Sequence, residues 1–164
     1  MKSVAVAILL LFVSGHLHTQ ENRHINLNLM IDEQIPFQGE INMTFVIEKR
    51  EKNKDTISIH YLPGEILMQD SVFQKIKSDS AESISMNISY TRSCKSIWSY
   101  FYTIEIYKSW LLSSFCNIRI YNLDNKENKK IFLPLEGRQY TYEVDTPNGS
   151  VTRLKKKIDE KACH

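Results

Sequence analysis

The chain contains few glycines, and none of them stands in a pattern that catalysis or phosphate binding requires. Only five of its 164 residues are glycine. A phosphate-binding loop needs closely spaced glycines, and a lipase-type serine needs the GxSxG turn that lifts it above a sheet. HExxH and EF-hand patterns are also absent, and the adjacent carboxyls of Asp32 and Glu33 are typical of a solvated turn. We therefore expect no enzyme activity, no catalytic residue, no metal site and no cofactor.

The chain also lacks an apolar run long enough to span a bilayer, which takes about 20 residues. Its first apolar run, from Val4 to Val13, follows Lys2 and precedes the small residues Ser14 and Gly15. These features are typical of a secretory signal peptide. We expect residues 1–20 to hold the signal, with its cleavage point left open. The mature protein is then expected to be secreted and extracellular, without a transmembrane span.

Neither sign of charge dominates the sequence. The chain has 21 Lys and Arg residues against 19 Asp and Glu residues, a balance that does not call for nucleic acid as a partner. Positive charges cluster at residues 126–130 (KENKK) and 153–157 (RLKKK). Such clusters are more often solvated surface, although they would also suit an anionic partner surface.

Cysteine is scarce as well. Cys94, Cys116 and Cys163 are the three candidates for disulfide formation. In an oxidising compartment they predict one disulfide and one remaining thiol. The residues alone leave all three pairings open, and the spacing does not favour a zinc site.

What the sequence has in abundance is alternation of apolar and polar side chains. Ile25, Leu27, Leu29 and Ile31 share one face of a half-buried strand. About eight such segments follow one another, at residues 25–31, 41–47, 57–61, 84–90, 100–106, 118–120, 131–135 and 140–144. No window supports a helix of three turns, and residues 65–79 are expected to form a short strand or an irregular connection. The pattern predicts an all-β fold, an antiparallel two-sheet β-sandwich of residues 21–145, followed by a basic tail of residues 146–164.

Three sequons fit the pattern for N-glycosylation, at Asn42, Asn87 and Asn148. Asn42 and Asn87 fall on the polar phase of their predicted strands. A glycan at either position would project into water without disturbing the core.

One predicted turn is unusually apolar. Trp110, Leu111, Leu112 and Phe115 lie between the strands predicted at 100–106 and 118–120, where a solvated hairpin tip normally carries Gly, Asn, Asp or Pro. The turn either forms an exposed contact loop or folds back to close the open end of the sandwich. The sequence leaves both placements open.

The residues from Ile25 to Leu135 resemble a known family. The runs from Ile25 to Ile59, Glu82 to Tyr90 (ESISMNISY) and Tyr100 to Leu135 are similar to the C-terminal PLAT-type β-sandwich of the pancreatic-lipase superfamily, in particular of the phosphatidic-acid-selective phospholipases lipase H and lipase I. The catalytic domain of those lipases has no counterpart here, so the resemblance implies no catalytic residue.

The resemblance implies that exposed apolar loops contact lipid interfaces or a protein cofactor. It also implies a Cys116–Cys163 disulfide, while Cys94–Cys116 stays open. We therefore predict a secreted, non-catalytic PLAT-like module that binds lipid surfaces or a lipase-type protein partner. The candidate contact residues are Trp98, Lys108, Trp110, Leu111, Leu112 and Phe115. The alternatives are an extracellular interaction factor, ligand or inhibitor, with the apolar hairpin as its hot spot, and a shortened product of a secreted phospholipase.

Overall fold

Nine strands carry most of the structure over the residues that the computed structural model describes, which are 21–49, 54–78, 81–93, 97–152 and 155. The strands are β1 (Asn22–Ile31), β2 (Ile41–Lys49), β3 (Lys54–Leu62), β4 (Glu65–Gln69), β5 (Ala81–Ser93), β6 (Ile97–Ile106), β7 (Cys116–Asn122), β8 (Tyr140–Thr146) and β9 (Gly149–Val151). The helices are α1 (Asp70–Lys77), α2 (Lys108–Leu111) and α3 (Lys126–Ile131), with a 3₁₀ turn, η1, at Gln38–Glu40. The predicted all-β fold is confirmed.

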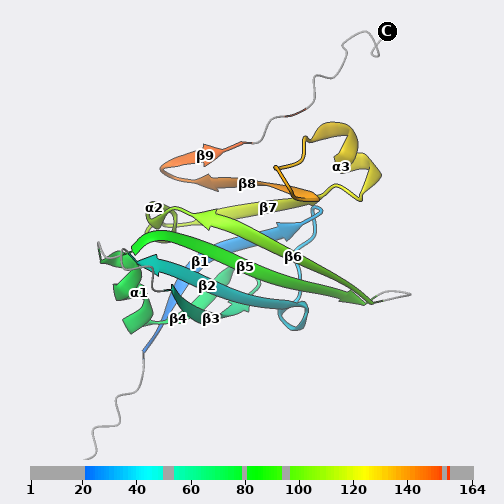
Figure 1. Cartoon of the computed structure of the whole chain (residues 1–164). Coiled ribbons are helices and arrows are strands. Elements are labelled where there is room, and N and C mark those ends of the chain that lie inside the picture. Colours follow the sequence, from blue (N-terminus) through cyan, green and yellow to red (C-terminus); the bar gives the residue numbers. More distant parts are fainter. Residues whose placement is uncertain (1–20, 50–53, 79–80, 94–96, 153–154, 156–164) are drawn as a thin grey trace, which may run out of the picture.

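The strands form one continuous hydrogen-bonded sheet in the order β6-β5-β2-β3-β4-β1-β7-β8-β9. Strands β1 and β7 pair in parallel, from Leu27 opposite Cys116 to Ile31 opposite Ile120, and the other neighbours are antiparallel. The sheet is therefore mixed, and the predicted antiparallel sandwich of two sheets is not confirmed. Instead the single sheet curls so that its inner face encloses the core (Figure 1).

Strand alternation explains this inner face. In β1 the residues Ile25, Leu27, Leu29 and Ile31 are buried, while the asparagines between them point outward. The same period of two continues through the other long strands, and their inward side chains join one cluster with those of β1. A sheet that buries only one face requires a cover for that face, and the curl supplies the cover from the sheet itself.

Two helices close one end of the curled sheet. The α1 residues Val72, Phe73 and Ile76 and the α2 residues Trp110 and Leu111 are all buried in the main core. We call this the helical end, and it lies on the left in Figure 1. Strand β4 is thus the expected short strand at the start of this segment, and α1 after it is a helix that the sequence did not predict. A helix of eight residues is stabilised by packing rather than by its own propensity, so its signal in the sequence is weak.

The apolar segment around Trp110 is not a hairpin tip. Strand β6 pairs with β5, whereas β7 pairs with β1 and β8, so the connection crosses from one edge of the sheet to its other half. The predicted hairpin was wrong, because alternation within a strand identifies its buried face but not its neighbour.

The strand predicted at residues 131–135 was also wrong. Helix α3 occupies Lys126–Ile131, and it begins at Asn125, whose side chain accepts a hydrogen bond from the backbone N of Glu127 at 3.0 Å. After it, Phe132 makes an isolated bridge with Lys155. The Nδ2 of buried Asn128 donates to the backbone O of Asn122 at 3.0 Å and so holds the helix against β7.

A strained turn stands at the other end of β1. Asp32 and Glu33 have φ angles of 49° and 63°, and backbone hydrogen bonds in both directions join Ile31 to Gln34 around them. Positive φ at both central positions is the geometry of a type I′ turn, which normally contains Asn and Gly. The turn aims the Asp32 carboxylate at the backbone N and Nδ2 of Asn122, at 2.9 and 2.8 Å, and at Nδ2 of Asn128, at 2.6 Å.

Candidate functional site

The helical end brings together some of the residues that the sequence singles out and separates others. Trp110 and Leu111 are 7% and 2% exposed and belong to the core, where the Tyr107 ring meets the Trp110 ring edge to face at 4.7 Å. The expectation that these two residues are available for surface contact is therefore corrected. They close the end of the curled sheet, which is the second of the two placements that the sequence left open.

Leu112 and Phe115 lie on the surface of the same end. They are 46% and 36% exposed. Hydrogen bonds hold the backbone between them: Asn26 Nδ2 donates to the Ser114 carbonyl at 2.9 Å, and the Ser113 hydroxyl donates to the Ser109 carbonyl at 2.7 Å. The two apolar side chains are thus presented by a loop that is tied to β1 and α2.

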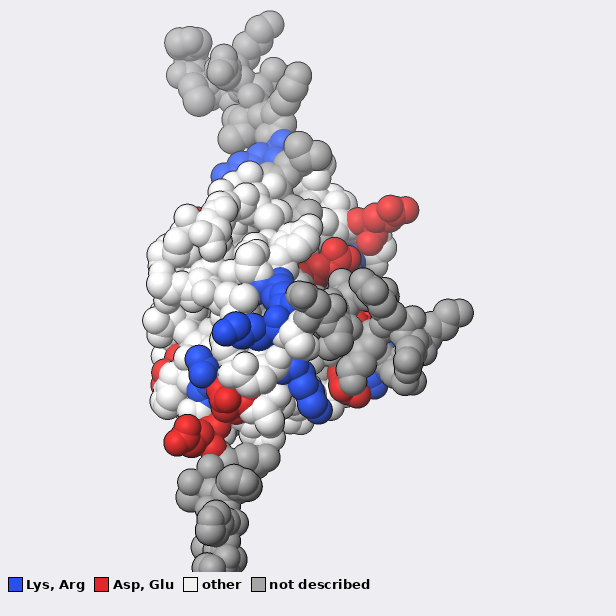
Figure 2. Space-filling model, turned by 90° about the vertical axis from the view of Figure 1, so that its left-hand side faces the viewer, with Lys and Arg blue, Asp and Glu red and all other residues white. Residues whose placement is uncertain are grey.

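Lysines of both helices lie at this end. Lys75 and Lys77 are exposed on α1, and Lys108 Nζ on α2 donates to the backbone O of Ser78 at 2.5 Å, which places it at the C-terminal end of α1. Figure 2 views the molecule from this end and shows blue basic side chains, with red acidic ones beside some of them, next to a broad area without charge. We call Lys75, Lys77, Lys108, Leu112 and Phe115 the basic apolar patch.

Sequence reasoning found Lys108, Leu112 and Phe115 but missed the α1 lysines, because it did not predict α1. The signal for α1 was the group Val72, Phe73 and Ile76, which share one face of a helix.

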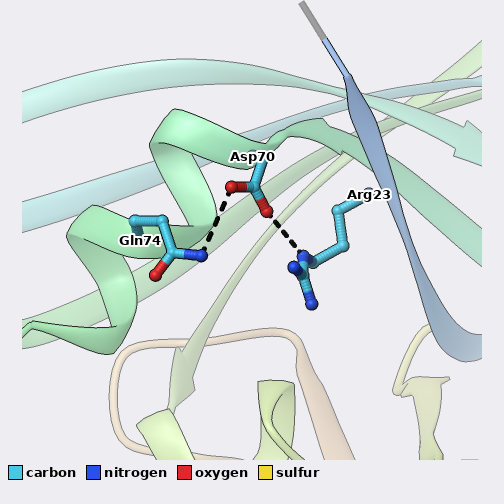
Figure 3. Close-up of polar contacts among 3 residues, drawn as sticks. All are labelled: Arg23, Asp70 and Gln74. Atoms are coloured by element: carbon cyan, nitrogen blue, oxygen red, sulfur yellow. Dashed lines mark hydrogen bonds and ion pairs between the residues drawn. The ribbon is translucent and has the colours of Figure 1, made fainter.

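An ion pair fastens α1 to β1 beside this patch. The Arg23 Nε donates to Asp70 Oδ1 at 2.8 Å, and Gln74 Nε2 donates to Asp70 Oδ2 at 3.3 Å (Figure 3). The Arg23 guanidinium also lies 4.2 Å from the centre of the Phe73 ring. The hydrogen bond from Arg23, followed by that from Gln74, lowers the pKa of the Asp70 carboxyl. The only negative side chain of α1 is thus engaged by Arg23, and the helix presents its lysines to solvent.

Trp98 lies at the opposite end of the molecule from the patch. It is 57% exposed near the start of β6, and with Tyr90, Arg92 and Tyr100 it lines a cavity of about 310 Å³. The lysines of residues 126–130 lie on α3, also away from the helical end (Figure 1). Trp98, one of the predicted contact residues, and this lysine cluster therefore do not adjoin the apolar loop.

Cys116 is the only cysteine among the described residues. It is fully buried, with a free thiol at the start of β7. Burial, with a smaller effect of the Asp145 charge, raises the pKa of this thiol to about 12. Both pairings that involve Cys116, with Cys94 and with Cys163, are therefore corrected. Cys94 and Cys163 lie outside the described residues, and the pairing between them stays a prediction.

Asn42 and Asn87 lie on the outer faces of their strands, as the strand phase predicts, and Asn148 lies in the turn before β9. Asn42 and Asn148 are exposed, and Asn87 is half-buried on the outer face of β5, where its Oδ1 accepts a hydrogen bond from the Thr103 hydroxyl at 2.9 Å. Asn148 Nδ2 lies 3.3 Å from the Ser113 hydroxyl, close to the basic apolar patch. Use of these three positions for glycosylation stays a prediction.

Within the described part of the chain, no group of three or more His, Cys, Asp and Glu side chains is arranged to hold a metal ion. Among the described helices, none has the length and apolar character that a membrane span needs.

Comparisons of the chain with protein-family models, with curated proteins and with solved structures find no match.

Proposed function

We propose that this protein is a secreted, non-catalytic module that adsorbs to lipid surfaces with anionic headgroups through the basic apolar patch. The observation that supports this best is the joint presentation of Leu112 and Phe115 with Lys75, Lys77 and Lys108 at one end of the molecule. Peripheral proteins bind membranes by this combination of apolar insertion and electrostatic attraction. The likeness to lipase tail domains is part of the proposal and rests on the sequence runs that carry it.

The expected adsorption is weak and depends on anionic lipid. Insertion of Leu112 and Phe115 removes on the order of 150 Å² of apolar surface from water, or roughly 4 kcal/mol before ordering costs. Three lysines near an anionic surface contribute about 1 kcal/mol each. Because Trp110 and Leu111 are in the core, the apolar contribution is smaller than insertion of all four residues would supply. Neutral membranes should therefore retain little protein.

Co-sedimentation with vesicles tests the proposal. Deglycosylated protein should sediment with vesicles of phosphatidylcholine and phosphatidylserine, and much less with phosphatidylcholine alone. Reversal of two charges in Lys75→Glu/Lys77→Glu should weaken binding at least tenfold. The matched control is Lys126→Glu/Lys129→Glu on α3, which should bind within about twofold of the unmodified chain, because α3 lies away from the patch.

The fluorescence emission of a tryptophan placed in the patch gives a second test of vesicle binding. Trp110 is already buried and Trp98 lies far from the patch, so the emission of the unmodified protein should not change on binding. Leu112→Trp should shift to shorter wavelength when anionic vesicles are added. Absence of that shift, or equal loss of binding in both double variants, would overturn the proposal and favour a protein partner.

A further inference from the structure

The outer edge of β6 is a candidate site for pairing with another strand. Strand β6 is the first strand of the sheet and pairs with β5 on one side (Figure 1). At Thr103 the other side is covered by side chains: Thr103 N donates to Tyr140 Oη at 2.7 Å, and Thr103 O accepts from Tyr140 Oη and from Arg138 Nη1. The backbone groups of Thr103 therefore point away from β5.

The backbone groups of Ile97, Ser99 and Phe101 point the same way. In an antiparallel pair, successive residues direct their N–H and C=O groups alternately toward and away from the partner strand. The register of β6 with β5 continues without a shift from Ile97 to Ile106, so the alternation holds along the strand. A groove of about 670 Å³ separates Ser99–Thr103 from Asn122, Asp124 and residues 137–140 of the same chain, and it leaves space along this edge.

Except at Thr103, where Arg138 and Tyr140 cover the edge, this part of β6 lacks the devices that usually protect an edge strand. Residues 97–104 include no charged side chain and no proline, and the strand has no bulge. Ile97, Trp98 and Phe101 are 75%, 57% and 74% exposed. The pairing of β2 with β5 ends at Tyr90, so the β5–β6 hairpin extends past the end of β2. A long, apolar, uncharged edge of this kind is a template for another strand.

Because residues 97–104 carry no charge, this edge can pair with the same edge of a second copy of the chain. We infer that β6 pairs with β6 of a second copy in an antiparallel register centred on Ser99. In that register Ile97 lies opposite Phe101 of the second copy, and Phe101 lies opposite its Ile97. Trp98 and Tyr100 face each other in the same reciprocal way. No charges of equal sign meet, and a small hydroxyl side chain stands at the twofold axis.

The area supports a weak dimer. The exposed parts of Ile97, Trp98 and Phe101 amount to roughly 350 Å² per copy, given the usual areas of aromatic side chains. With the backbone of both strands the interface reaches about 1,000 Å², near the lower limit for specific association. We therefore expect dissociation in the micromolar range. The edge at residues 97–103 and the basic apolar patch lie at opposite ends of the molecule. This inference therefore does not depend on lipid binding.

Sedimentation equilibrium of the full mature chain at concentrations from about 1 to 500 µM tests the pairing. The unmodified protein should pass from monomer to dimer. Phe101→Lys should raise the dissociation constant at least tenfold, because it places two like charges in the interface. Phe37→Lys is the matched control, since Phe37 is 75% exposed but lies in the β1–β2 connection, and it should change the constant less than twofold.

A cysteine at the proposed axis tests the register. Opposed residues of this kind have Cα atoms about 5.5 Å apart, within the range that a disulfide spans. Ser99→Cys should form a covalent dimer whose peptides link residue 99 to residue 99, and Phe37→Cys should not. A monomer over the whole concentration range, a dimer that Phe101→Lys does not weaken, or absence of the residue 99 linkage would overturn the inference.

Discussion

The backbone of Asp32 is strained, and the hydrogen bonds of its side chain offset the free energy that this strain costs. A φ of 49° is unfavourable for a residue with a Cβ by about 1 kcal/mol. In return, its carboxylate accepts three hydrogen bonds from Asn122 and Asn128, both of which are buried. Through these hydrogen bonds the turn holds β1 against β7 and α3, at the end of the molecule opposite the helical end.

Substitutions in this turn should act in opposite directions. Asp32→Ala should lower the free energy of unfolding by about 2–4 kcal/mol, because it leaves buried donors of Asn122 and Asn128 without an acceptor. Glu33→Gly should leave stability unchanged or raise it by up to about 1 kcal/mol, because glycine adopts the φ of 63° without strain. Urea unfolding monitored by circular dichroism measures both. An equal loss in the two variants would contradict the role of the carboxylate.

Cys116 should behave as an inert thiol. Its side chain is fully buried and its pKa is raised to about 12, so the reactive thiolate is scarce at neutral pH. We expect no modification of Cys116 by iodoacetamide in the native protein and complete modification in denaturant, as read by peptide mass spectrometry. Recovery of Cys116 in a disulfide from native protein would contradict the buried free thiol.

At the scale of elements, the turn of α2 directs some of its adjacent apolar residues into the core and leaves the next one at the surface. Trp110 and Leu111 fill the core, and Leu112, one residue on, is half-exposed. A short helical turn produces this division because successive residues point about 100° apart around its axis. The apolar character of the segment thus serves packing first and surface contact second.

Truncation at Trp110 and at Leu112 should therefore have different effects on stability and on vesicle binding. Trp110→Ala should cost about 3–5 kcal/mol of stability, as large-to-small changes of buried aromatics do. Leu112→Ala should cost less than about 1 kcal/mol but weaken vesicle binding. Thermal unfolding compares the two variants. Similar small losses in both would contradict the placement of Trp110 in the core.

At the scale of the whole molecule, tyrosines join the first strand of the curled sheet, β6, to strands β7 and β8 near its other edge. Tyr102 of β6 meets Tyr140 of β8 edge to face at 5.0 Å, and its hydroxyl donates to Asn122 Oδ1 of β7 at 2.9 Å. Burial raises the pKa of Tyr102 strongly, and burial also raises the pKa of Tyr61, to about 12. These phenols remain neutral in the folded protein at pH values where they ionise in the unfolded chain.

The fold should therefore lose stability in alkali. Because the folded-state pKa values are raised, the stabilisation is fully present below pH 10, near the unfolded value, and decreases as the pH rises toward about 12. Urea unfolding at several pH values should show a constant midpoint below about pH 9 and a declining one above about pH 10. Tyr61→Phe should flatten that decline. Ionisation of all the tyrosines near pH 10 in the folded protein, seen by absorbance, would contradict the prediction.

The period of two along the chain already identified most strands and their buried faces. Ile118 and Ile120 of β7, for example, are both buried, as their alternation predicts. Three features escaped because their signals are not periodic within one segment. Helix α1 is too short for a helical period to stand out, α3 depends on the Asn125 cap and on buried Asn128, and β7 pairs with β1, which is distant in sequence.

The sequence by itself determined that this chain is built from strands and which side of each strand is apolar, because side chains alternate across a strand whatever its neighbours are. Only the tertiary structure decided that the strands join in one curled sheet, that Trp110 is enclosed while Leu112 is not, and that lysines from two helices meet at one end. Those outcomes depend on contacts between residues far apart in the chain, and periodicity within a segment carries no information about them.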